Sequence, residues 1–427
     1  MNYQTEHDCL CWGGVNTRKL AEEYGTPLYV MDEMMIRQAA ADHTEAIKNY
    51  FGGNGRAVFA SKAFCCKEIY RLLKEEEFGA DVVSGGELYT AVAAGMDASK
   101  LVFHGNNKTK EELSMAIRYG VGLIVVDNFY ELERLNRLAG EEGVTQQILL
   151  RIKPGVEAHT HAFIKTGQID SKFGLALETG EAMEAVKAAL AASNLDLQGV
   201  HCHIGSQIFD TEPFGLAAKV MVEFMSDVRE ETGETLPILI LGGGFGISFL
   251  PTDDPKPVAE YYATIRKAME ESCNEVAFPM PFLMTEPGRS IVGPAGITLY
   301  TIGNVKEIPG VRTYVSVDGG MTDNPRYALY QADYTATVAN RMKKAKTEKV
   351  TIAGKCCESG DLLQEHMDLQ PCTPGDLLAV FATGAYNYSM SSNYNRIPRP
   401  AVVFCKEGKS RVVVERETYG DLMRNDY

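Results

Sequence analysis

Short apolar runs recur between residues 57 and 289, and amphipathic segments separate many of them. The runs are rich in β-branched and aromatic residues and lack the polar alternation of a half-exposed strand. This pattern is typical of a parallel sheet that is covered on both faces. The eight runs are AVFASK (57–62), ADVVS (80–84), LVFHG (101–105), GLIVVDN (122–128), ILLRIKP (148–154), GVHCHIGS (199–206), ILILGGGFG (238–246) and FLMTEPGR (282–289).

Several of the intervening segments repeat apolar residues at intervals of three and four, as amphipathic helices do. They are CKEIYRLLKEEEF (66–78), KEELSMAIRYG (110–120), FYELERLNRLAGEE (129–142) and EAMEAVKAALAAS (181–193). Eight strand–helix units close a barrel and span roughly 250 residues. We therefore predict an α/β fold with a TIM-like (β/α)₈ barrel over residues 36–288. An open, doubly wound sheet is the alternative that the pattern leaves open.

Beyond residue 288 the apolar runs follow one another without helical segments. This predicts an antiparallel β-sandwich or β-barrel domain over residues 289–427. Residues 1–35 precede the barrel and are expected to join the β domain, although PLYVMD (27–32) suits a strand of either domain. The C-terminal runs are RTYVSVD (312–318), KVTIAG (349–354), LLAVFATG (377–384), RPAVVFCKEG (399–408) and RVVVERE (411–417).

Length and composition restrict the class of protein and its partners. A chain of 427 residues with 45% hydrophobic and 23% charged residues indicates a globular protein of two domains. The net charge of −15 argues against nucleic acid and anionic membranes as partners. No run of about 18 apolar residues occurs, and the N-terminus lacks the basic-then-apolar order of a signal peptide. We expect a cytoplasmic protein.

The ten cysteines do not form the pattern of a disulfide framework. Two adjacent pairs occur, Cys65–Cys66 and Cys356–Cys357, and free thiols are the expectation for a cytoplasmic protein. No CxxC pair with the spacing of a metal site is present, so we expect no zinc.

Polar or glycine-rich residues repeatedly follow the apolar runs. Active sites of (β/α)₈ barrels lie at the carboxyl ends of the strands. The residues concerned are Lys62, Asp81, Ser84, His104, Arg151, His201, His203, Gly242 to Gly246 and Glu286 to Arg289. Their convergence predicts the site more strongly than any single motif does.

Each of these residues also has an ordinary structural interpretation. Lys62 is a candidate Schiff-base lysine, because desolvation at the barrel mouth would lower the pKa of its amine, or it is a solvated strand-end lysine. GGGFG (242–246) is either a turn or a backbone cradle for a phosphate. Glu286 and Arg289 form an internal ion pair, or Glu286 faces a pyridine nitrogen. His203 is a core histidine or an aromatic ring against a planar cofactor.

In the β domain three polar stretches interrupt the strands, and each is a surface loop or part of a site. VDGGMTDNPRYALY (317–330) contains Arg326 and Tyr330. AGKCCESGDLL (353–363) contains Cys357, Glu358 and Asp361, and ATGAYNYSMSSNYN (382–395) contains Tyr386.

Taken together, the motifs resemble the diaminopimelate decarboxylase family, which depends on pyridoxal 5′-phosphate (PLP) and belongs to the alanine-racemase-like class. The resemblance covers nearly the whole chain and implies a barrel followed by a β domain. HIGSQ and EPGR are shared with ornithine and arginine decarboxylases of this fold, whereas SKFG, DNPRYALY and CESGD favour the diaminopimelate branch. The motifs are FASKAF, GADVVSGGEL, HTHAFIKTGQIDSKFG (159–174), HCHIGSQI, LGGGFGI, EPGR, VDGGMTDNPRYALY and CCESGDLL.

The resemblance implies a role for each matching residue. Lys62 corresponds to the lysine that holds PLP as a Schiff base, His203 to the histidine stacked on the ring, and Glu286 to the partner of the pyridine nitrogen. The implied cofactor-binding residues are Lys62, Asp81, His203, Ser206, Gly243, Gly244, Glu286, Gly288, Arg289 and Tyr386. The implied substrate-binding residues are Arg289, Arg326, Tyr330, Glu358 and Tyr386, and the implied catalytic residues are Lys62, His203 and Cys357.

In the family that it resembles, the cysteine and glutamate of the CESGD motif reach across a dimer interface. The resemblance therefore implies a homodimer with shared sites, in which Cys357 donates a proton and Glu358 reads the distal amine of the substrate. This chain has Lys355 and Cys356 where the family commonly has a proline and a small apolar residue. The register of ESGD favours Cys357 over Cys356 as the thiol of the site.

The implied activity is decarboxylation of meso-2,6-diaminopimelate to L-lysine and CO₂, the last step of lysine biosynthesis. A decarboxylase of D-ornithine, D-lysine or carboxynorspermidine on the same scaffold is the nearest alternative. A PLP-binding homologue without catalysis is a second alternative, but Lys62 and Cys357, which such proteins typically lose, are both present.

Overall fold

The computed structural model describes residues 4–156 and 170–427, which divide into two compact units. Ala39–Ile247 and Asp254–Ser290 form the barrel unit. Met1–Gln38, Ser248–Asp253 and Ile291–Tyr427 form the β unit. Most of the HTHAFIKTGQIDSKFG motif lies outside the described residues.

The sequence predicts domain boundaries between residues 35 and 36 and between residues 288 and 289. In the structure the corresponding limits fall at 38/39 and 290/291. The short segment Ser248–Asp253 groups with the β unit, which was not foreseen from the sequence. This segment follows the GGGFG motif, where the apolar run has already ended.

Eight parallel strands close the barrel, which confirms the predicted fold and rules out the open sheet. The sheet closes because β13 pairs with β5, and every other barrel strand pairs with its neighbours in parallel. Each of the eight apolar runs overlaps one of these strands, and four of the strands begin before their run. They are β5 (Gly55–Ala60), β6 (Gly79–Val82), β7 (Leu101–Phe103), β8 (Leu123–Val126), β9 (Gln146–Lys153), β11 (Leu195–His201), β12 (Ile238–Ile240) and β13 (Phe282–Thr285).

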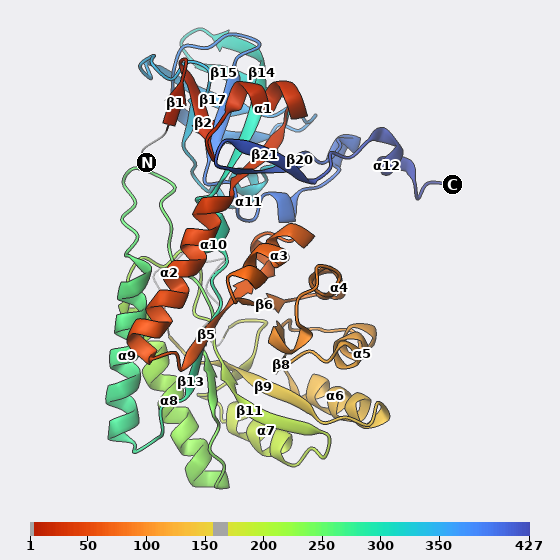
Figure 1. Ribbon diagram of the computed structural model, residues 1–427, viewed down its shortest axis with the longest axis vertical. Coiled ribbons are helices and arrows are strands. Elements are labelled where there is room, and N and C mark those ends of the chain that lie inside the picture. The colour runs from red at the N-terminus through yellow and green to blue at the C-terminus, as the bar shows by residue number, and fades with distance from the viewer. Residues whose placement is uncertain (1–3, 157–169) are drawn as a thin grey trace. The chain divides into compact units, whose positions relative to one another are not determined.

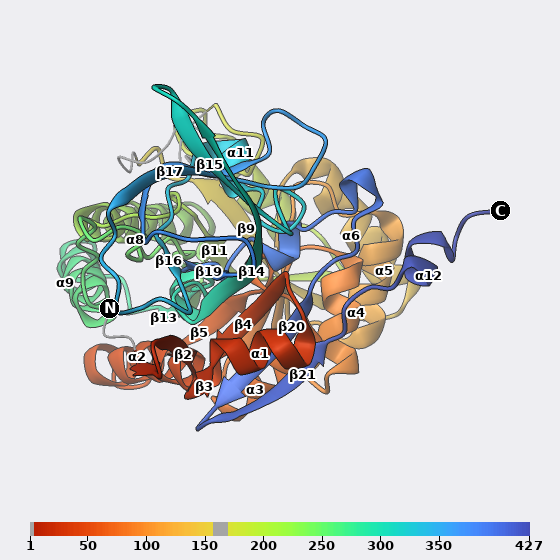
Figure 2. The ribbon, with the colours of Figure 1, turned by 90° about the horizontal axis from the view of Figure 1, so that it is seen from above.

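Helices surround the strands of the barrel unit (Figure 1; Figure 2). Their ends follow local sequence signals: α5 begins after Thr109, which forms a capping box with Glu112, and ends at Gly120 in the left-handed conformation. The helices are α2 (Glu33–Phe51), α3 (Lys67–Glu75), α4 (Gly85–Ala93), α5 (Lys110–Tyr119), α6 (Phe129–Glu141), α7 (Glu181–Leu190), α8 (Glu212–Thr232) and α9 (Val258–Glu275). A two-residue strand, β10 (Leu175–Ala176), extends the sheet beside β9.

The sheet of the β unit is mixed, which corrects the prediction of a purely antiparallel domain. The N-terminal strand β4 (Leu28–Asp32) runs antiparallel to β14 (Gly296–Ile308) but parallel to β20 (Ala401–Lys406). Likewise β15 (Arg312–Val317) pairs in parallel with β17 (Glu348–Ala353). Parallel neighbours need a long crossover connection rather than a hairpin, and a sequence-based reading of adjacent runs does not reveal it.

The remaining elements of the β unit include short helices that were not expected from the sequence. α11 (Arg326–Tyr330) lies within the VDGGMTDNPRYALY stretch, and α12 (Tyr419–Met423) lies near the C-terminus. The other strands are β1 (Gln4–Glu6), β2 (Cys9–Trp12), β3 (Val15–Asn16), β16 (Ala336–Val338), β18 (Leu362–Leu369), β19 (Leu377–Phe381) and β21 (Lys409–Val414). The other helices are α1 (Thr17–Tyr24) and α10 (Arg289–Val292).

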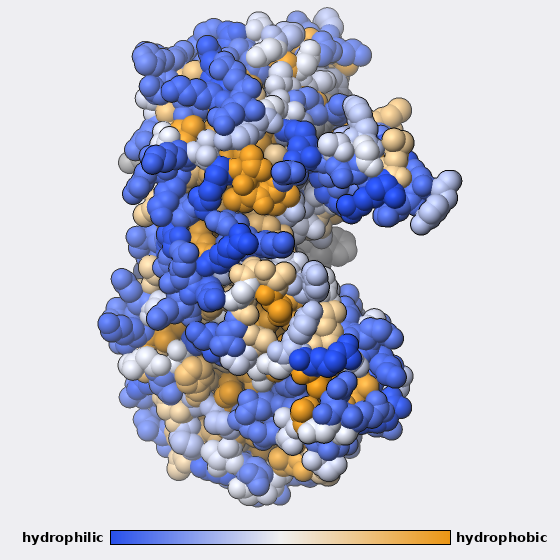
Figure 3. All heavy atoms as spheres, turned by 45° about the vertical axis from the view of Figure 1, so that its right-hand side comes forward, coloured by the Kyte–Doolittle hydropathy of each residue, from blue (hydrophilic) through white to orange (hydrophobic). Residues whose placement is uncertain are grey.

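Hydrophilic residues cover most of the face seen in Figure 3, with apolar side chains in scattered patches. This agrees with the high content of acidic residues. Among the helices of residues 4–156 and 170–427, none combines the length and the apolar character needed to cross a membrane.

A buried ion pair joins the loop after β7 to α6. The amine of Lys108 lies 2.6 Å from Oε1 of Glu131, and the two side chains are 1% and 4% exposed. The amine also donates to the carbonyl oxygens of Gly105 and Val125, at 2.8 and 2.7 Å. All three hydrogens of the ammonium group therefore have acceptors, as a buried cation requires.

We expect Lys108→Met to lower the free energy of unfolding by about 3–5 kcal/mol, because it leaves the Glu131 carboxylate buried without its cation. Urea denaturation measures this loss. Arg137→Met is the matched control: its 4.0 Å pair with Glu141 is exposed, and its loss should cost about 0–1 kcal/mol. Equal losses in the two variants would contradict the argument.

Candidate active site

Polar side chains stand at the carboxyl ends of the barrel strands. Because these strands are parallel, their ends lie at one edge of the barrel. Lys62 follows β5 in a short 3₁₀ turn, Ser61–Ala63, and its side chain is exposed. The other residues are Asp81 in β6, His104 after β7, Arg151 in β9, His201 at the end of β11 and Glu286 after β13.

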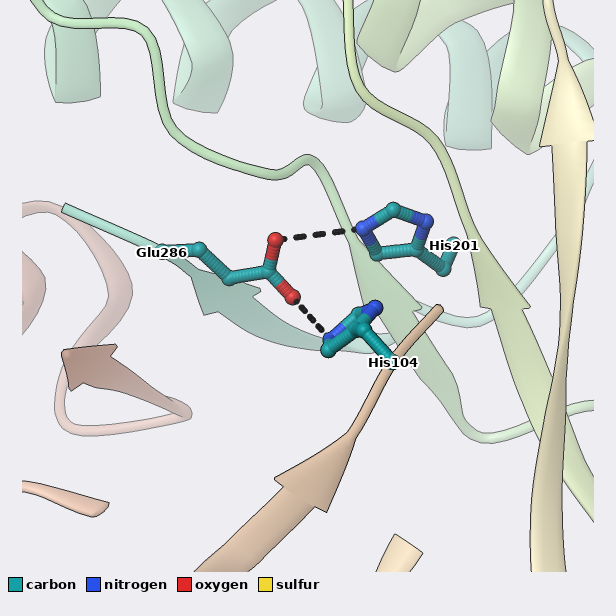
Figure 4. Close-up of side chains that lie close together, drawn as sticks. All are labelled: His104, His201 and Glu286. Atoms are coloured by element: carbon teal, nitrogen blue, oxygen red, sulfur yellow. Dashed lines mark hydrogen bonds and ion pairs between the residues drawn. The ribbon is translucent and has the colours of Figure 1, made fainter. Parts of the chain in front are cut away.

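Glu286 lies between two histidines from other strands (Figure 4). Nε2 of His201 is 3.1 Å from Oε2 of the carboxylate in a hydrogen bond, and Nε2 of His104 is 2.8 Å from Oε1. The side chains of Glu286, His104 and His201 are 7%, 5% and 1% exposed. Each carboxylate oxygen therefore faces one imidazole nitrogen inside the barrel.

The surroundings of Glu286 favour its ionised form. Burial raises the pKa of the carboxyl, but attraction and hydrogen bonding by His104 and His201 together outweigh burial and hold that pKa well below its usual range. Burial lowers the pKa of His201 to about 4, so its imidazole is neutral near pH 7. A neutral His201 that donates from Nε2 has an acceptor at Nδ1, and this atom is buried and has no hydrogen-bond partner within residues 4–156 and 170–427.

Asp81 adds a second buried carboxyl group to the barrel mouth. Burial raises its pKa to about 6, against the attraction of His104 and Lys62. Its Oδ1 atom has no hydrogen-bond partner among the described residues. Burial is also the main reason that the pKa of His203 is well below its usual range, and the nearby charge of Lys62 acts in the same direction. Lys62, Asp81 and His203 thus belong to one electrostatic cluster.

The GGGFG motif forms a turn that leaves no room for side chains. Gly244 has φ of +110°, and a Cβ there would lie 2.5 Å from the carbonyl oxygen of Gly205. A Cβ at Gly243 would lie 2.1 Å from the carbonyl oxygen of Glu286. The amide of Gly243 points to Nδ1 of His203, at 3.4 Å. The turn is therefore a close approach of backbones, as expected of an anion cradle.

Beside this turn, Nη2 of Arg289 donates to the hydroxyl of Ser206 at 3.0 Å. Gly288 is packed closely as well, because a Cβ there would lie 2.9 Å from Cβ of Ala60. Ser84 has a structural role, since its hydroxyl accepts from the amide of Glu87 and caps α4. The predicted residues Ser206, Gly288 and Arg289 are thus brought together, and Ser84 is not among them.

In the β unit three of the predicted residues meet. The guanidinium carbon of Arg326 lies 5.5 Å from the ring centroid of Tyr330 and 5.6 Å from that of Tyr386. Tyr386 has a positive φ of 62°, which is rare for a residue with a side chain. The two aromatic rings flank one cation, although Tyr386 is far from Arg326 in the sequence.

The CCESGD segment is tied down by Asp361. The Asp361 carboxylate accepts from the amide of Met321 at 2.6 Å and from the amide of Cys356 at 2.7 Å. Burial and the charge of Asp361 raise the pKa of the Cys356 thiol to about 12. Cys357 is exposed, as is Glu358, and the amide of Cys357 donates to Oδ1 of Asn395 at 2.7 Å. The two neighbouring thiols are therefore in different environments.

Asp323, three residues before Arg326, is buried and anchors the loop. It is 1% exposed, accepts from the amide of Gly320 at 2.9 Å and receives the hydroxyl hydrogen of Tyr300. Burial is the main reason that its pKa is raised to about 7. The loop that precedes Arg326 is thereby fixed from inside the unit.

Known proteins are similar to this chain over almost its whole length. Residues 37–293 match the family described as pyridoxal-dependent decarboxylase, pyridoxal binding domain. The chain is 52% identical to the diaminopimelate decarboxylase of Bacillus subtilis over 99% of this chain and 96% of that protein. This chain belongs to the diaminopimelate decarboxylase family.

Solved structures of the family share the fold. The diaminopimelate decarboxylase of m. jannaschii, in complex with L-lysine, has a TM-score of 0.93 and 38% identity and covers 100% of this chain and 98% of that one. The Helicobacter pylori enzyme, also in complex with L-lysine, has a TM-score of 0.88 and 32% identity, with 96% and 98% covered.

The family implies PLP, and the residues present fit this cofactor. A phosphate needs donors and a backbone that can approach it closely; the hydroxyl of Ser206 and the guanidinium of Arg289 offer donors, and the turn at Gly243 and Gly244 carries no side chains. A pyridine nitrogen that stays protonated needs a carboxylate, and Glu286 is held as an anion. The buried oxygen of Asp81 that lacks a hydrogen bond also indicates a polar ligand in the barrel mouth.

His104, His201 and Arg151 were predicted at strand ends from the sequence, but without a role. Two of them bracket Glu286, and Arg151 lies over the ring of Phe173 at 4.3 Å with Asp127 3.9 Å from its Nε. The sequence signal that pointed to these three residues was their position at the ends of apolar runs. Spacing alone could not reveal which of these side chains touch.

Gly244→Ala should raise the dissociation constant for PLP on the order of 10- to 100-fold, because the turn must shift to accommodate the added Cβ. Gly233→Ala is the control: it also has a positive φ, of +80°, but nothing lies within 4 Å of its Cβ. Titration of the cofactor-free proteins with PLP measures both constants. Weaker binding in both variants, or in neither, would refute the role of the turn.

Asp323→Asn should change the pH dependence of stability. The folded protein holds a proton on Asp323 up to a pKa of about 7, whereas the unfolded chain releases it near 3.8. The contribution of this bound proton to the free energy of unfolding is therefore lost as the pH rises from 4 to 7. Urea denaturation should show that the stability of the wild type minus that of the variant falls between pH 5 and 7 and then levels off. A constant difference would count against this pKa.

Proposed function

We propose that the chain catalyses the PLP-dependent decarboxylation of meso-2,6-diaminopimelate to L-lysine and CO₂, the last step of lysine biosynthesis. The observation that carries the proposal is the barrel mouth, where an anionic Glu286 faces a glycine turn backed by Ser206 and Arg289. The end-to-end match to relatives of this name supports the substrate.

PLP supplies the electron sink for the electron pair that remains when the α-carboxylate leaves as CO₂. In our proposal Lys62 would hold the cofactor covalently, Glu286 would keep the proton on its ring nitrogen, and His203 would lie against the ring. The residues that bind the phosphate and the remaining polar groups are Asp81, Ser206, Gly243, Gly244, Gly288, Arg289 and Tyr386.

We propose that the enzyme selects its substrate by the distal carboxylate and the distal amine of the substrate. Arg326, flanked by Tyr330 and Tyr386, would bind a carboxylate, together with Arg289, and Glu358 would bind the distal amine. A diamino acid without the distal carboxylate would leave a desolvated cation unpaired, at a cost of about 2–5 kcal/mol.

Cys357 is proposed to deliver the proton that replaces CO₂ on the α-carbon. The neighbouring thiol is less suited, because burial and Asp361 raise the pKa of Cys356 to about 12. Cys357 is exposed on its protomer, and its backbone is fixed by Asn395. A proton donor must reach the substrate, so an exposed, anchored thiol fits this role better than a half-buried one.

We further propose a homodimer in which Cys357 and Glu358 serve the site of the partner subunit. The resemblance of CESGD to the family motif supports this proposal, as do exposed apolar side chains near α4 and α6, namely Val83, Tyr89, Phe129 and Tyr130. The ten cysteines are free thiols, which supports the proposed cytoplasmic location.

Arg326→Ala should lower kcat/KM for meso-diaminopimelate by the equivalent of about 2–5 kcal/mol. The assay follows CO₂ release and L-lysine formation by the wild type and the variant. Arg312→Ala, which removes a partly exposed pair with Glu365, is the control and should retain activity. Faster turnover of D-ornithine or D-lysine by the wild type, or full activity of Arg326→Ala, would contradict the assignment.

Cys357→Ser should lose most of kcat, whereas Cys356→Ser should keep it. The Lys62→Ala and Cys357→Ser variants are unfolded, mixed in equal amounts and refolded together. About a quarter of the wild-type activity should return, since half of the dimers are hybrids and each hybrid has one complete site. Activity that stays absent in the mixture, with dimers present, would exclude shared sites. Loss of activity in Cys356→Ser alone would assign the proton to the other thiol.

A further inference from the structure

The contacts of Glu286 suggest a role for two histidines that the proposed function leaves without one. We propose that His104 and His201 are positioning residues that hold both carboxylate oxygens of Glu286, so that it remains a fixed anion facing the ring nitrogen of the cofactor. The inference rests on the proposed role of Glu286 and goes beyond it by naming what keeps that residue in place and charged.

Geometry is the first support. The imidazoles approach the carboxylate from two different strands and meet separate oxygens, at 2.8 and 3.1 Å (Figure 4). Their rings pack edge to face with centroids 4.7 Å apart. Rotation of the carboxylate about its last bond would break the hydrogen bond to His201 and the 2.8 Å contact with His104, so the two rings favour one orientation.

The backbone makes this arrangement rigid. The amide of His104 donates to the carbonyl oxygen of Val82 at 2.8 Å, and the amide of Glu286 donates to that of Gly242 at 2.7 Å. His201 ends β11, which is paired with β9 on one side and β12 on the other. All three side chains therefore project from hydrogen-bonded strand ends, and such sites hold their geometry better than free loops do.

Charge is the second support. The other ionisable groups near Glu286 are Asp81 from β6, Arg151 from β9, and Cys202 and His203 after β11. A negative charge on Asp81 disfavours the ionised form of Glu286, whereas the positive charge of Arg151 favours it. A carboxylate that is 7% exposed would take up a proton if its donors were removed. A protonated Glu286 could no longer stabilise a positive ring nitrogen.

The three side chains also have the composition of a metal site, since one ligand atom from each lies within 4.8 Å of the others. A bound divalent cation would require the two histidines to act as metal ligands, whereas our proposal requires them to donate hydrogen bonds. A hydrogen-bond donor can be replaced by glutamine, which carries an N–H group, whereas glutamine is a poor substitute for an imidazole ligand of zinc.

The test uses matched pairs of variants, His104→Met with His104→Gln and His201→Met with His201→Gln. Methionine and glutamine have similar size, but only glutamine donates a hydrogen bond. PLP is titrated into the cofactor-free proteins and the visible absorbance of the lysine-bound cofactor is recorded from pH 6 to 9. Unfolding of the cofactor-free proteins is measured alongside.

We expect each methionine variant to bind PLP on the order of 10- to 100-fold more weakly at pH 7, and the glutamine variants to recover most of the affinity. The ratio of wild-type to variant affinity should grow as the pH falls, because Glu286 then becomes protonated in the variant alone. For the reaction, kcat should fall while KM for the substrate changes little. In a Glu286→Gln background the methionine substitutions should add almost nothing.

Several outcomes would overturn the proposal. One is affinity that falls equally in the methionine and glutamine variants. Others are an effect of the methionine substitutions that is undiminished in the Glu286→Gln background, and loss of PLP binding by the wild type after treatment with EDTA, which would indicate a metal.

The same experiment separates this inference from the proposed function. If Glu286→Gln impairs PLP binding but the methionine variants bind as the wild type does, only the positioning role fails. If Glu286→Gln itself binds PLP and reacts as the wild type does, the proposed role of Glu286 fails and the positioning role fails with it.

Discussion

A buried carboxylate organises the barrel site. Glu286 is almost excluded from water, and a buried anion is stable only where donors or cations compensate it. His104 and His201 supply that compensation from β7 and β11. β11 lies two strands from β13 through β12, whereas β7 reaches the other side of β13 through β5 and β6, because β13 pairs with β5 and closes the sheet. Barrel closure therefore brings His104 to Glu286.

The same part of the chain sets the anion cradle. Gly243 packs against the carbonyl oxygen of Glu286 so closely that no side chain fits between them, and the amide of Glu286 is bonded to Gly242. The turn that we propose for the phosphate therefore also fixes the backbone of Glu286. A cofactor with a phosphate at one end and a pyridine nitrogen at the other would contact both features of one rigid junction.

Buried carboxyl groups have a comparable role in the β unit. Asp361 bonds the amides of Met321 and Cys356, and Asp323 bonds the amide of Gly320 and the hydroxyl of Tyr300. Both hold loops that contain residues of the proposed site, Arg326 and Cys357. Such an arrangement allows a polar loop to keep one conformation, because its amide groups are satisfied from inside.

The amino-acid sequence is sufficient to predict the barrel and the family. Each apolar run overlaps a strand because hydrophobic periodicity is local, and the predicted site follows from the convergence of strand-end residues wherever parallel strands close. Tertiary structure alone decided the parallel pairing of β4 with β20, the burial of Lys108 against Glu131 and the bracket around Glu286. These contacts join residues that are distant in the chain, and their partners are chosen by three-dimensional packing, which no local pattern encodes.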